Sequence, residues 1–141
     1  MRVLFRVLVV SFLTILLPFL ETAMGSDLRA DEASVVAAFE NYASAWKKQD
    51  IERVWSLMSP NLKKGNGGSV KIFEDFVKRN GFYPSDFQKI DVSVNDHKAT
   101  IKAKVIYLDF SGKRIGDDFE NIVFVRIDGE WYFDSYTSLD K

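Results

Sequence analysis

The chain contains no cysteine, one histidine and three prolines among its 141 residues. The absence of cysteine excludes disulfides, thiolate metal sites, a cysteine nucleophile and the lipid-bearing site of a lipoprotein. There are 19 lysines and arginines against 20 aspartates and glutamates, and the two signs are interspersed. The chain therefore lacks the concentrated basic face that nucleic-acid binding needs, and we predict no nucleic-acid partner.

Residues 1–25 have the pattern of a cleaved export signal. Two arginines precede an uncharged run from Val7 to Leu20, which has the length of a signal core and is short for a membrane span. Small residues before the junction predict cleavage between Gly25 and Ser26. We therefore expect a periplasmic or secreted protein that meets the membrane only through this segment. An uncleaved anchor is the alternative.

Residues 26–141 form one predicted domain that begins with three amphipathic helices. Apolar residues repeat at spacings of three and four over residues 31–48, where Asp31 is the expected N-cap. A second helix is predicted from Asp50 through Met58, and a third from Ser69 to Asn80–Gly81. Between them, the polar and glycine-rich segment Lys63–Gly68 is predicted to be a mobile loop.

After Gly81 the apolar period changes from about 3.6 to 2, which predicts strands. Ile90, Val92 and Val94 alternate with polar residues, and a turn at Asn95–Asp96 leads into a second strand that keeps one phase from Ala99 to Tyr107. Further turns at Ser111–Gly112 and Asp128–Gly129 give four antiparallel strands in total.

A two-residue turn at Asp128–Gly129 fixes the register of the last hairpin. Phe124 then lies opposite Phe133, and Arg126 lies opposite Trp131, on one face of the sheet. The other face carries Val123, Val125 and Tyr132. Because an apolar outer face would otherwise meet water, this pattern predicts a homodimer through the outer sheet face.

Three helices followed by a curved antiparallel four-stranded sheet make an α+β domain. This order, together with the segments Phe39–Trp46, Gln49–Ile51, Trp55–Pro60 and Ile127–Tyr136, resembles the nuclear transport factor 2-like superfamily, whose fold is also called the cystatin-like or cone fold. The resemblance implies a cone-shaped pocket between the sheet and the first helix. Some members use this pocket for isomerisation, dehydration or cyclisation of small hydrophobic molecules, and others only for binding, so the fold alone does not give the function.

The candidate site residues are mainly aromatic. Nine of them are expected to line the pocket or to fill the core around it: Tyr42, Trp46, Trp55, Phe73, Phe76, Tyr107, Phe124, Trp131 and Phe133. Tyr42 and Asp109 are the candidates for acid–base catalysis, because Asp109 follows Tyr107 on one strand face. A core tyrosine and a turn aspartate are the alternative interpretations.

The remaining polar residues predict neither a cofactor nor a metal. The single histidine, His97, falls beside the first hairpin turn and is expected on the surface. Asp117, Asp118 and Glu120 lack the spacing of a calcium loop, so a solvated hairpin edge is the preferred interpretation.

The first expectation for function is a non-enzymatic exported domain that binds a small apolar or amphipathic ligand, or a protein partner, through the pocket and the sheet. The alternatives are a small isomerase or dehydratase of the ketosteroid isomerase or polyketide cyclase type, and a periplasmic assembly or immunity-type interaction protein. A fully packed cone would favour the interaction protein. An open cavity with a buried carboxylate would favour the enzyme, and an open cavity lined by apolar residues would favour ligand binding.

Overall fold

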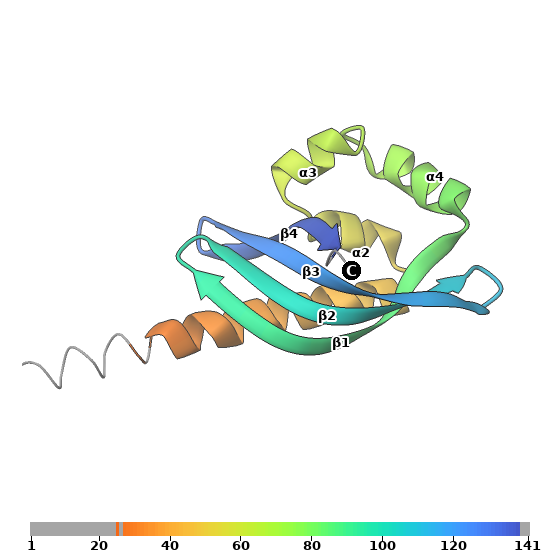
Figure 1. Cartoon of the computed structure of the whole chain (residues 1–141). Coiled ribbons are helices and arrows are strands. Elements are labelled where there is room, and N and C mark those ends of the chain that lie inside the picture. The colour runs from red at the N-terminus through yellow and green to blue at the C-terminus, as the bar shows by residue number, and fades with distance from the viewer. Residues whose placement is uncertain (1–24, 26, 139–141) are drawn as a thin grey trace, which may run out of the picture.

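The computed structural model describes residues 25 and 27–138, in which four helices accompany one four-stranded antiparallel sheet (Figure 1). A first helix over residues 27–47 is followed by α2 (Ile51–Ser56), α3 (Pro60–Gly65) and α4 (Val70–Asn80). The strands are β1 (Phe82–Asn95), β2 (Lys98–Asp109), β3 (Arg114–Ile127) and β4 (Glu130–Ser138), in the spatial order β1-β2-β3-β4. The predicted α+β class with a curved antiparallel sheet is confirmed.

The amino-terminal segment before Gly25 lies outside the described residues, as does Ser26 at the predicted cleavage junction. The export signal and its cleavage therefore stay predictions. Among residues 25 and 27–138, no helix is both long enough and apolar enough to cross a membrane.

The first helix packs along one face of the sheet through the apolar positions that its period predicts. Val35, Phe39, Tyr42 and Trp46 are all buried, because they recur on one side of the helix at spacings of three and four. Asp31, expected as the N-cap, instead lies inside this helix. Its carboxylate is turned to Arg126 on β3 rather than to the backbone of its own helix.

The segment after α2 corrects the predicted loop. The second helix ends at Ser56 rather than Met58, and a further helix, α3, begins at Pro60 and includes Lys63 to Gly65. Ser59 is its N-cap, since its hydroxyl accepts from the Leu62 amide at 3.1 Å, and proline fits the first helical position because no amide donor is needed there.

Two glycines follow α3, and α4 forms as predicted. Gly67 has a φ of 89°, and a Cβ there would approach Ile72 Cγ2 to 2.6 Å, so this turn requires glycine. Ser69 caps α4, with its hydroxyl accepting from the Ile72 amide at 3.4 Å. Gly81 ends the helix in the left-handed conformation with a φ of 77°.

The sheet register is confirmed at the last hairpin. Phe124 pairs with Phe133 and Arg126 with Trp131, and the turn residues Asp128 and Gly129 both have positive φ, at 51° and 83°. This backbone matches the twist of the strands that it joins. Beyond Phe133 the register shifts by one residue, which leaves Asp134 as a bulge.

A second irregularity corrects the predicted inner face of β1. The register also shifts between Lys89 and Asp91, and Ile90, expected to point inward, has 52% of its surface exposed. Val92 and Val94 are half-buried against the core, and the inward phase of β2 from Ala99 to Val105 is fully buried. The bulge therefore changes which residues of β1 face the helices.

The outer edge of β4 is paired with the segment between α2 and α3. The Ser59 amide donates to the Phe133 carbonyl at 2.7 Å, and the Phe133 amide donates to the Leu57 carbonyl at 2.9 Å. The Ser59 hydroxyl also donates to the carboxylate of the bulged Asp134 at 2.5 Å. These contacts join the segment before α3 to β4.

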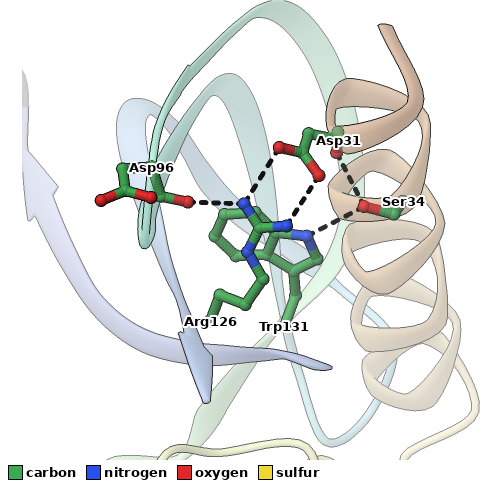
Figure 2. A network of polar contacts seen from close by, with 5 residues as sticks. All are labelled: Asp31, Ser34, Asp96, Arg126 and Trp131. Carbon is green, nitrogen blue, oxygen red and sulfur yellow. Dashed lines mark hydrogen bonds and ion pairs between the residues drawn. The ribbon is translucent and has the colours of Figure 1, made fainter. Parts of the chain in front are cut away.

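One end of the sheet is closed by a polar network that joins the first helix to two hairpin turns (Figure 2). The Arg126 guanidinium donates to both carboxylate oxygens of Asp31, at 2.7 and 3.0 Å, and to the Asp96 carbonyl at 2.7 Å. The same guanidinium lies 4.8 Å from the ring of Trp131, whose indole N–H donates to the Ser34 hydroxyl at 2.9 Å. We call this the paired end of the molecule.

The outer face of the sheet is less exposed than its composition suggests. Val123 is only 6% exposed within the single chain, and Val125 and Tyr132 are half-buried. Val123 lies between Thr100 and Ser135 of the neighbouring strands, which cover part of it. Phe119, on the same phase of β3 as Val123 and Val125, is 46% exposed. The homodimer through this face stays a prediction.

Candidate ligand-binding cavity

An open cavity of about 410 Å³ lies at the other end of the molecule from the paired end. Its walls come from the first helix, from the arch formed by α3 and α4, and from strands β1 and β4 (Figure 1). Most of its lining side chains are apolar or aromatic, and none is a carboxylate: Tyr42, Trp46, Met58, Leu62, Asn66, Phe73, Phe76, Val77, Asn80, Phe82, Pro84, Phe133, Ser135 and Tyr136.

Stacked aromatic rings make the floor of this cavity. The Tyr42 ring stacks on Phe133 with centroids 4.4 Å apart, and Phe133 in turn contacts Tyr136 at 4.7 Å. Trp46 packs edge-on against both Tyr42 and Phe73. Rings that hold one another in several directions leave few alternative rotamers, so the floor is rigid.

Two tyrosine hydroxyls meet at the floor. Tyr42 reaches from the first helix and Tyr136 from β4, and their hydroxyl oxygens form a short hydrogen bond. Burial raises the pKa of Tyr42, an effect that the hydrogen bond to Tyr136 reduces only in part. Loss of solvent around its hydroxyl also raises the pKa of Tyr136, although 37% of the residue's surface is exposed. Both groups are therefore neutral phenols at physiological pH.

The indole N–H of Trp46 lies beside this pair and has no hydrogen-bond acceptor within residues 25 and 27–138. It is near enough to the Tyr42 hydroxyl to lower the pKa of that phenol, yet hydrogen-bonding geometry is not reached. Because Trp46 is only 5% exposed, water does not replace the missing acceptor easily. Buried donors without a partner are uncommon in native proteins and call for an explanation.

A buried carboxyl lies behind the cavity. Glu120, on the inner face of β3, is 9% exposed and accepts a short hydrogen bond from the Tyr107 hydroxyl, while its other oxygen has no partner in the described chain. Burial raises the pKa of Glu120, and the negative charge of Asp118 raises it further. Tyr107 packs edge-on against Phe82, a residue of the cavity wall, with centroids 5.7 Å apart.

The structure brings five of the nine expected aromatic residues to the cavity, namely Tyr42, Trp46, Phe73, Phe76 and Phe133. The other four lie elsewhere. Trp55 packs on Phe73 behind the wall, and Tyr107 contacts Glu120. Phe124 is part of the central core, and Trp131 belongs to the paired end, because its strand position lies next to the turn at the far end of the sheet.

Asp109 is not part of the cavity. Its carboxylate accepts from the amides of Ser111 and Lys113, both at 2.9 Å, and from the Ser111 hydroxyl at 2.6 Å. The Ser111 hydroxyl and the Lys113 amide lower the pKa of Asp109, which keeps it ionised. It stabilises the turn after β2, which is the alternative that the sequence left open.

The three acidic residues near the start of β3 do not converge. Asp117 pairs with Arg114 and Lys104, whereas Glu120 points to the interior. The solvated hairpin edge expected for all three is therefore wrong for Glu120. In the part of the chain that the structure describes, no three histidine, cysteine or acidic side chains are placed to hold a metal ion. His97 lies exposed in the first hairpin turn, as expected.

Tyr136 and Glu120 are the two polar groups near the floor that the sequence analysis missed. Glu120 shares its strand phase with the buried Ile122 and Phe124, so the alternation itself signalled that it points inward. The sequence gives no comparable indication for Tyr136. The extra residue at Asp134 changes which residues of β4 face inward, and it places Tyr136 opposite Ile122.

No protein-family model matches the sequence, and no curated protein matches it either. Solved structures are similar to it in three dimensions. A nuclear transport factor 2-like protein with a cystatin-like fold from Novosphingobium aromaticivorans has a TM-score of 0.58 at 14% identity, over 84% of this chain and 88% of that one. A nuclear transport factor 2-like protein of unknown function from Shewanella oneidensis has a TM-score of 0.56 at 10% identity, over 77% of this chain and 98% of that one.

A candidate dehydratase from the same family, from Streptomyces avermitilis, has a TM-score of 0.54 at 17% identity, over 77% of this chain and 94% of that one. The cystatin-like, nuclear transport factor 2-like fold that the sequence resembled is therefore confirmed. At these identities the likeness concerns the fold, and function has to be argued from the cavity.

Proposed function

We propose that this protein binds a small, largely apolar molecule in the cavity between its first helix, α4 and the sheet. The observation that supports this is an open volume of about 410 Å³ with a mainly apolar and aromatic lining and no carboxylate. This volume falls within the usual range of small-molecule sites. The proposal includes export, on the strength of the signal pattern in residues 1–25.

A neutral fluorescent probe, N-phenyl-1-naphthylamine, tests the proposal. Phe76 and Ile72 are both on α4 and are 46% and 49% exposed, but only Phe76 lines the cavity. Phe76→Asp places a carboxylate against the bound probe and is expected to weaken binding about tenfold or more, because an apolar ligand cannot solvate that charge. Ile72→Asp, the matched control, is expected to bind as the unmodified protein does.

Fluorescence titration measures both affinities, and thermal unfolding checks that both variants are folded. Equal weakening by the two substitutions would place the probe outside the cavity and contradict the proposal. Absence of any saturable probe binding by the unmodified protein would contradict it as well.

A second candidate function is acid–base catalysis, and the buried carboxyl of Glu120 favours it. Its raised pKa and its hydrogen bond from Tyr107 are typical of a group that exchanges protons at neutral pH. The likeness to a candidate dehydratase is compatible with this. Neither residue lines the cavity, however, and Phe82 of the cavity wall packs against Tyr107, so a ligand would have to displace Phe82 to reach Tyr107.

Hydrogen–deuterium exchange at the carbon next to a carbonyl separates the two functions. A catalyst accelerates this exchange in an enolisable aryl ketone dissolved in D2O, and Glu120→Gln abolishes the acceleration if Glu120 is the base. If the protein binds the ketone but the ketone exchanges no faster than in buffer, ligand binding is supported and catalysis is not. The third expectation, an interaction protein without a pocket, receives no support from an open cavity.

A further inference from the structure

The outer face of α4, which lies at the periphery of the molecule, carries two large apolar side chains (Figure 1). Ile72 and Phe76 are one turn apart on this helix and are 49% and 46% exposed, whereas Phe73 and Val77 on its inner side are buried. A surface helix normally turns a polar face outwards. This helix therefore has a second apolar face, in addition to the one that it packs against the core.

Both exposed side chains are held in place by their surroundings. Ile72 packs on the turn between α3 and α4, where a Cβ on Gly67 would lie 2.6 Å from its Cγ2 atom. Phe76 lines the cavity while it is half exposed, and so does Phe82 at the start of β1. The outer face of α4 therefore continues into the rim of the open cavity.

The arch formed by α3 and α4 is basic, although the chain as a whole is not. Residues 60–81 contain two acidic residues and five basic ones, which are Lys63, Lys64, Lys71, Lys78 and Arg79. The other described residues, 25, 27–59 and 82–138, contain 11 basic and 16 acidic residues. One of the two acidic residues of the arch, Glu74, is already paired with Lys78 at 2.7 Å. The arch therefore attracts an anionic surface, whereas the rest of the molecule repels one.

Basic side chains lie beside the exposed isoleucine. Ile72 shares a shallow hollow on the outer side of α4 with Lys78, Arg79 and Asp75. Lys71, which precedes Ile72 in the helix, is exposed as well. Neither Lys71 nor Arg79 takes part in an ion pair within residues 25 and 27–138. Both are therefore available to an anion outside the chain.

We propose that the outer face of α4 docks on an anionic lipid bilayer, with Ile72 and Phe76 inserted between the headgroups and with Lys71 and Arg79 against their phosphates. Helices that lie in a bilayer surface combine an apolar stripe with flanking lysines and arginines. A stable protein partner would need about 800 Å² on each side, far more than two side chains provide. Nucleic acid would use the positive charge alone and leave the apolar side chains in water.

Docking in this orientation brings the rim of the cavity to the bilayer. Phe76 belongs to both surfaces, so an apolar ligand passes from the lipid into the cavity without crossing water. Docking itself does not depend on the proposed ligand binding, because Ile72 lies on the docking face and outside the cavity. The two proposals can therefore fail separately.

The chain contains a matched control for this face. Lys71 and Ile72 are consecutive on α4, and Lys89 and Ile90 are consecutive on β1, with both lysines exposed and the isoleucines 49% and 52% exposed. Ile72→Asp is expected to weaken binding to vesicles of equal parts phosphatidylcholine and phosphatidylglycerol by about tenfold or more, and Lys71→Gln by about fivefold. Ile90→Asp and Lys89→Gln are expected to bind as the unmodified protein does. Vesicle sedimentation measures these affinities.

A label at one position reports which face meets the lipid, whatever becomes of residues 1–25. Because the chain has no cysteine, Ile72→Cys and Ile90→Cys each offer a single thiol for an environment-sensitive nitrobenzoxadiazole fluorophore. When the anionic vesicles are added, the emission of the label at residue 72 is expected to shift to the blue and to rise severalfold. The label at residue 90 is expected to stay unchanged. Thermal unfolding checks that each variant is folded.

The outcomes distinguish docking from the proposed function. Loss of vesicle binding by Ile72→Asp, with normal binding of N-phenyl-1-naphthylamine, supports docking. Equal weakening by Ile72→Asp and Ile90→Asp, equal binding to vesicles without phosphatidylglycerol, or an unshifted label at residue 72 would overturn docking while ligand binding stands. A blue shift at residue 72 that grows with protein concentration in the absence of vesicles would assign the face to a second copy of the chain and overturn docking as well. Failure of the probe to bind would overturn the proposed function instead.

Discussion

The two ends of the molecule treat their polar groups in opposite ways. At the paired end, Arg126 donates to Asp31 and to the Asp96 carbonyl, and Trp131 donates to Ser34 (Figure 2). At the cavity end, Trp46 has an indole N–H without an acceptor and Glu120 has an oxygen without a donor. The same residue type, tryptophan, is satisfied by its own chain in one place and not in the other.

The hydrogen-bonded side chains of the paired end stabilise the fold, whereas the unpaired polar atoms at the cavity end do not. A hydrogen bond made within the chain contributes to the free energy of unfolding, whereas an unpaired buried group lowers it until a partner arrives. The paired end joins the first helix to two hairpin turns and therefore stabilises the cone. The cavity end leaves the Trp46 N–H and one Glu120 oxygen unpaired, which costs stability.

The largest expected effect comes from truncating one aromatic side chain at each end. Trp131→Ala is expected to lower the free energy of unfolding by about 3–5 kcal/mol, because it leaves a cavity and removes the bond to Ser34. Phe76→Ala at the cavity wall, where the ring is half exposed, is expected to cost about 0.5 kcal/mol or less. Urea denaturation of the two variants measures both, and similar losses would refute the division of roles.

A smaller effect is expected from exchanging each tryptophan for phenylalanine. Both changes remove the same atoms from buried positions, but only Trp131→Phe breaks a hydrogen bond. We therefore expect Trp131→Phe to be less stable than Trp46→Phe by about 1 kcal/mol, the usual net value of one such bond. Chemical unfolding at one pH gives the comparison. Equal stabilities would mean that the Trp46 N–H is satisfied in the unliganded protein.

The smallest effect concerns the pH dependence that Glu120 confers. Its pKa in the folded protein is raised above the ordinary value of 4.5, so the protonated form is the one favoured by folding. The stability that this carboxyl contributes is present below pH 4.5 and is lost as the pH rises through the raised pKa. Glu120→Gln does not titrate, so its stability relative to the unmodified protein should increase from pH 4.5 towards neutrality.

Thermal unfolding across this pH range measures the difference. Asp109→Asn is the control from the exposed turn after β2. The Asp109 carboxyl has a lowered pKa, so its contribution is present above its ordinary pKa of 3.8 and is lost on acidification. Loss of stability in the same direction for both variants would show that the environment of Glu120 has been misassigned.

Periodic parts of the chain were predictable from the sequence. The inner face of the first helix, the caps of α4 and the pairing of Phe124 with Phe133 follow from spacing and from turn residues, because each depends on neighbours in the chain. The missed helix α3 had a local signal too, since Ser59 followed by Pro60 is a typical helix start.

The bulges at Ile90 and Asp134 and the unpaired indole N–H of Trp46 were harder to predict. The odd spacing from Phe87 to Val92, both packed against the core, hints at the bulge that exposes Ile90. The bulge at Asp134 has no comparable pattern before it, so Tyr136 could not be placed opposite Ile122. The missing acceptor of Trp46 is a property of several elements packed together, which no local pattern records.

The segment between α2 and α3 also covers the outer edge of β4, the last strand of the sheet. On the outer edge of β4, the Phe133 amide donates to Leu57 and the Phe133 carbonyl accepts from Ser59. A strand from another molecule therefore finds no free amide or carbonyl of Phe133 with which to pair. Sheet extension by a neighbouring copy at this edge is blocked by the protein's own backbone, which protects the chain from growing into a continuous sheet through β4.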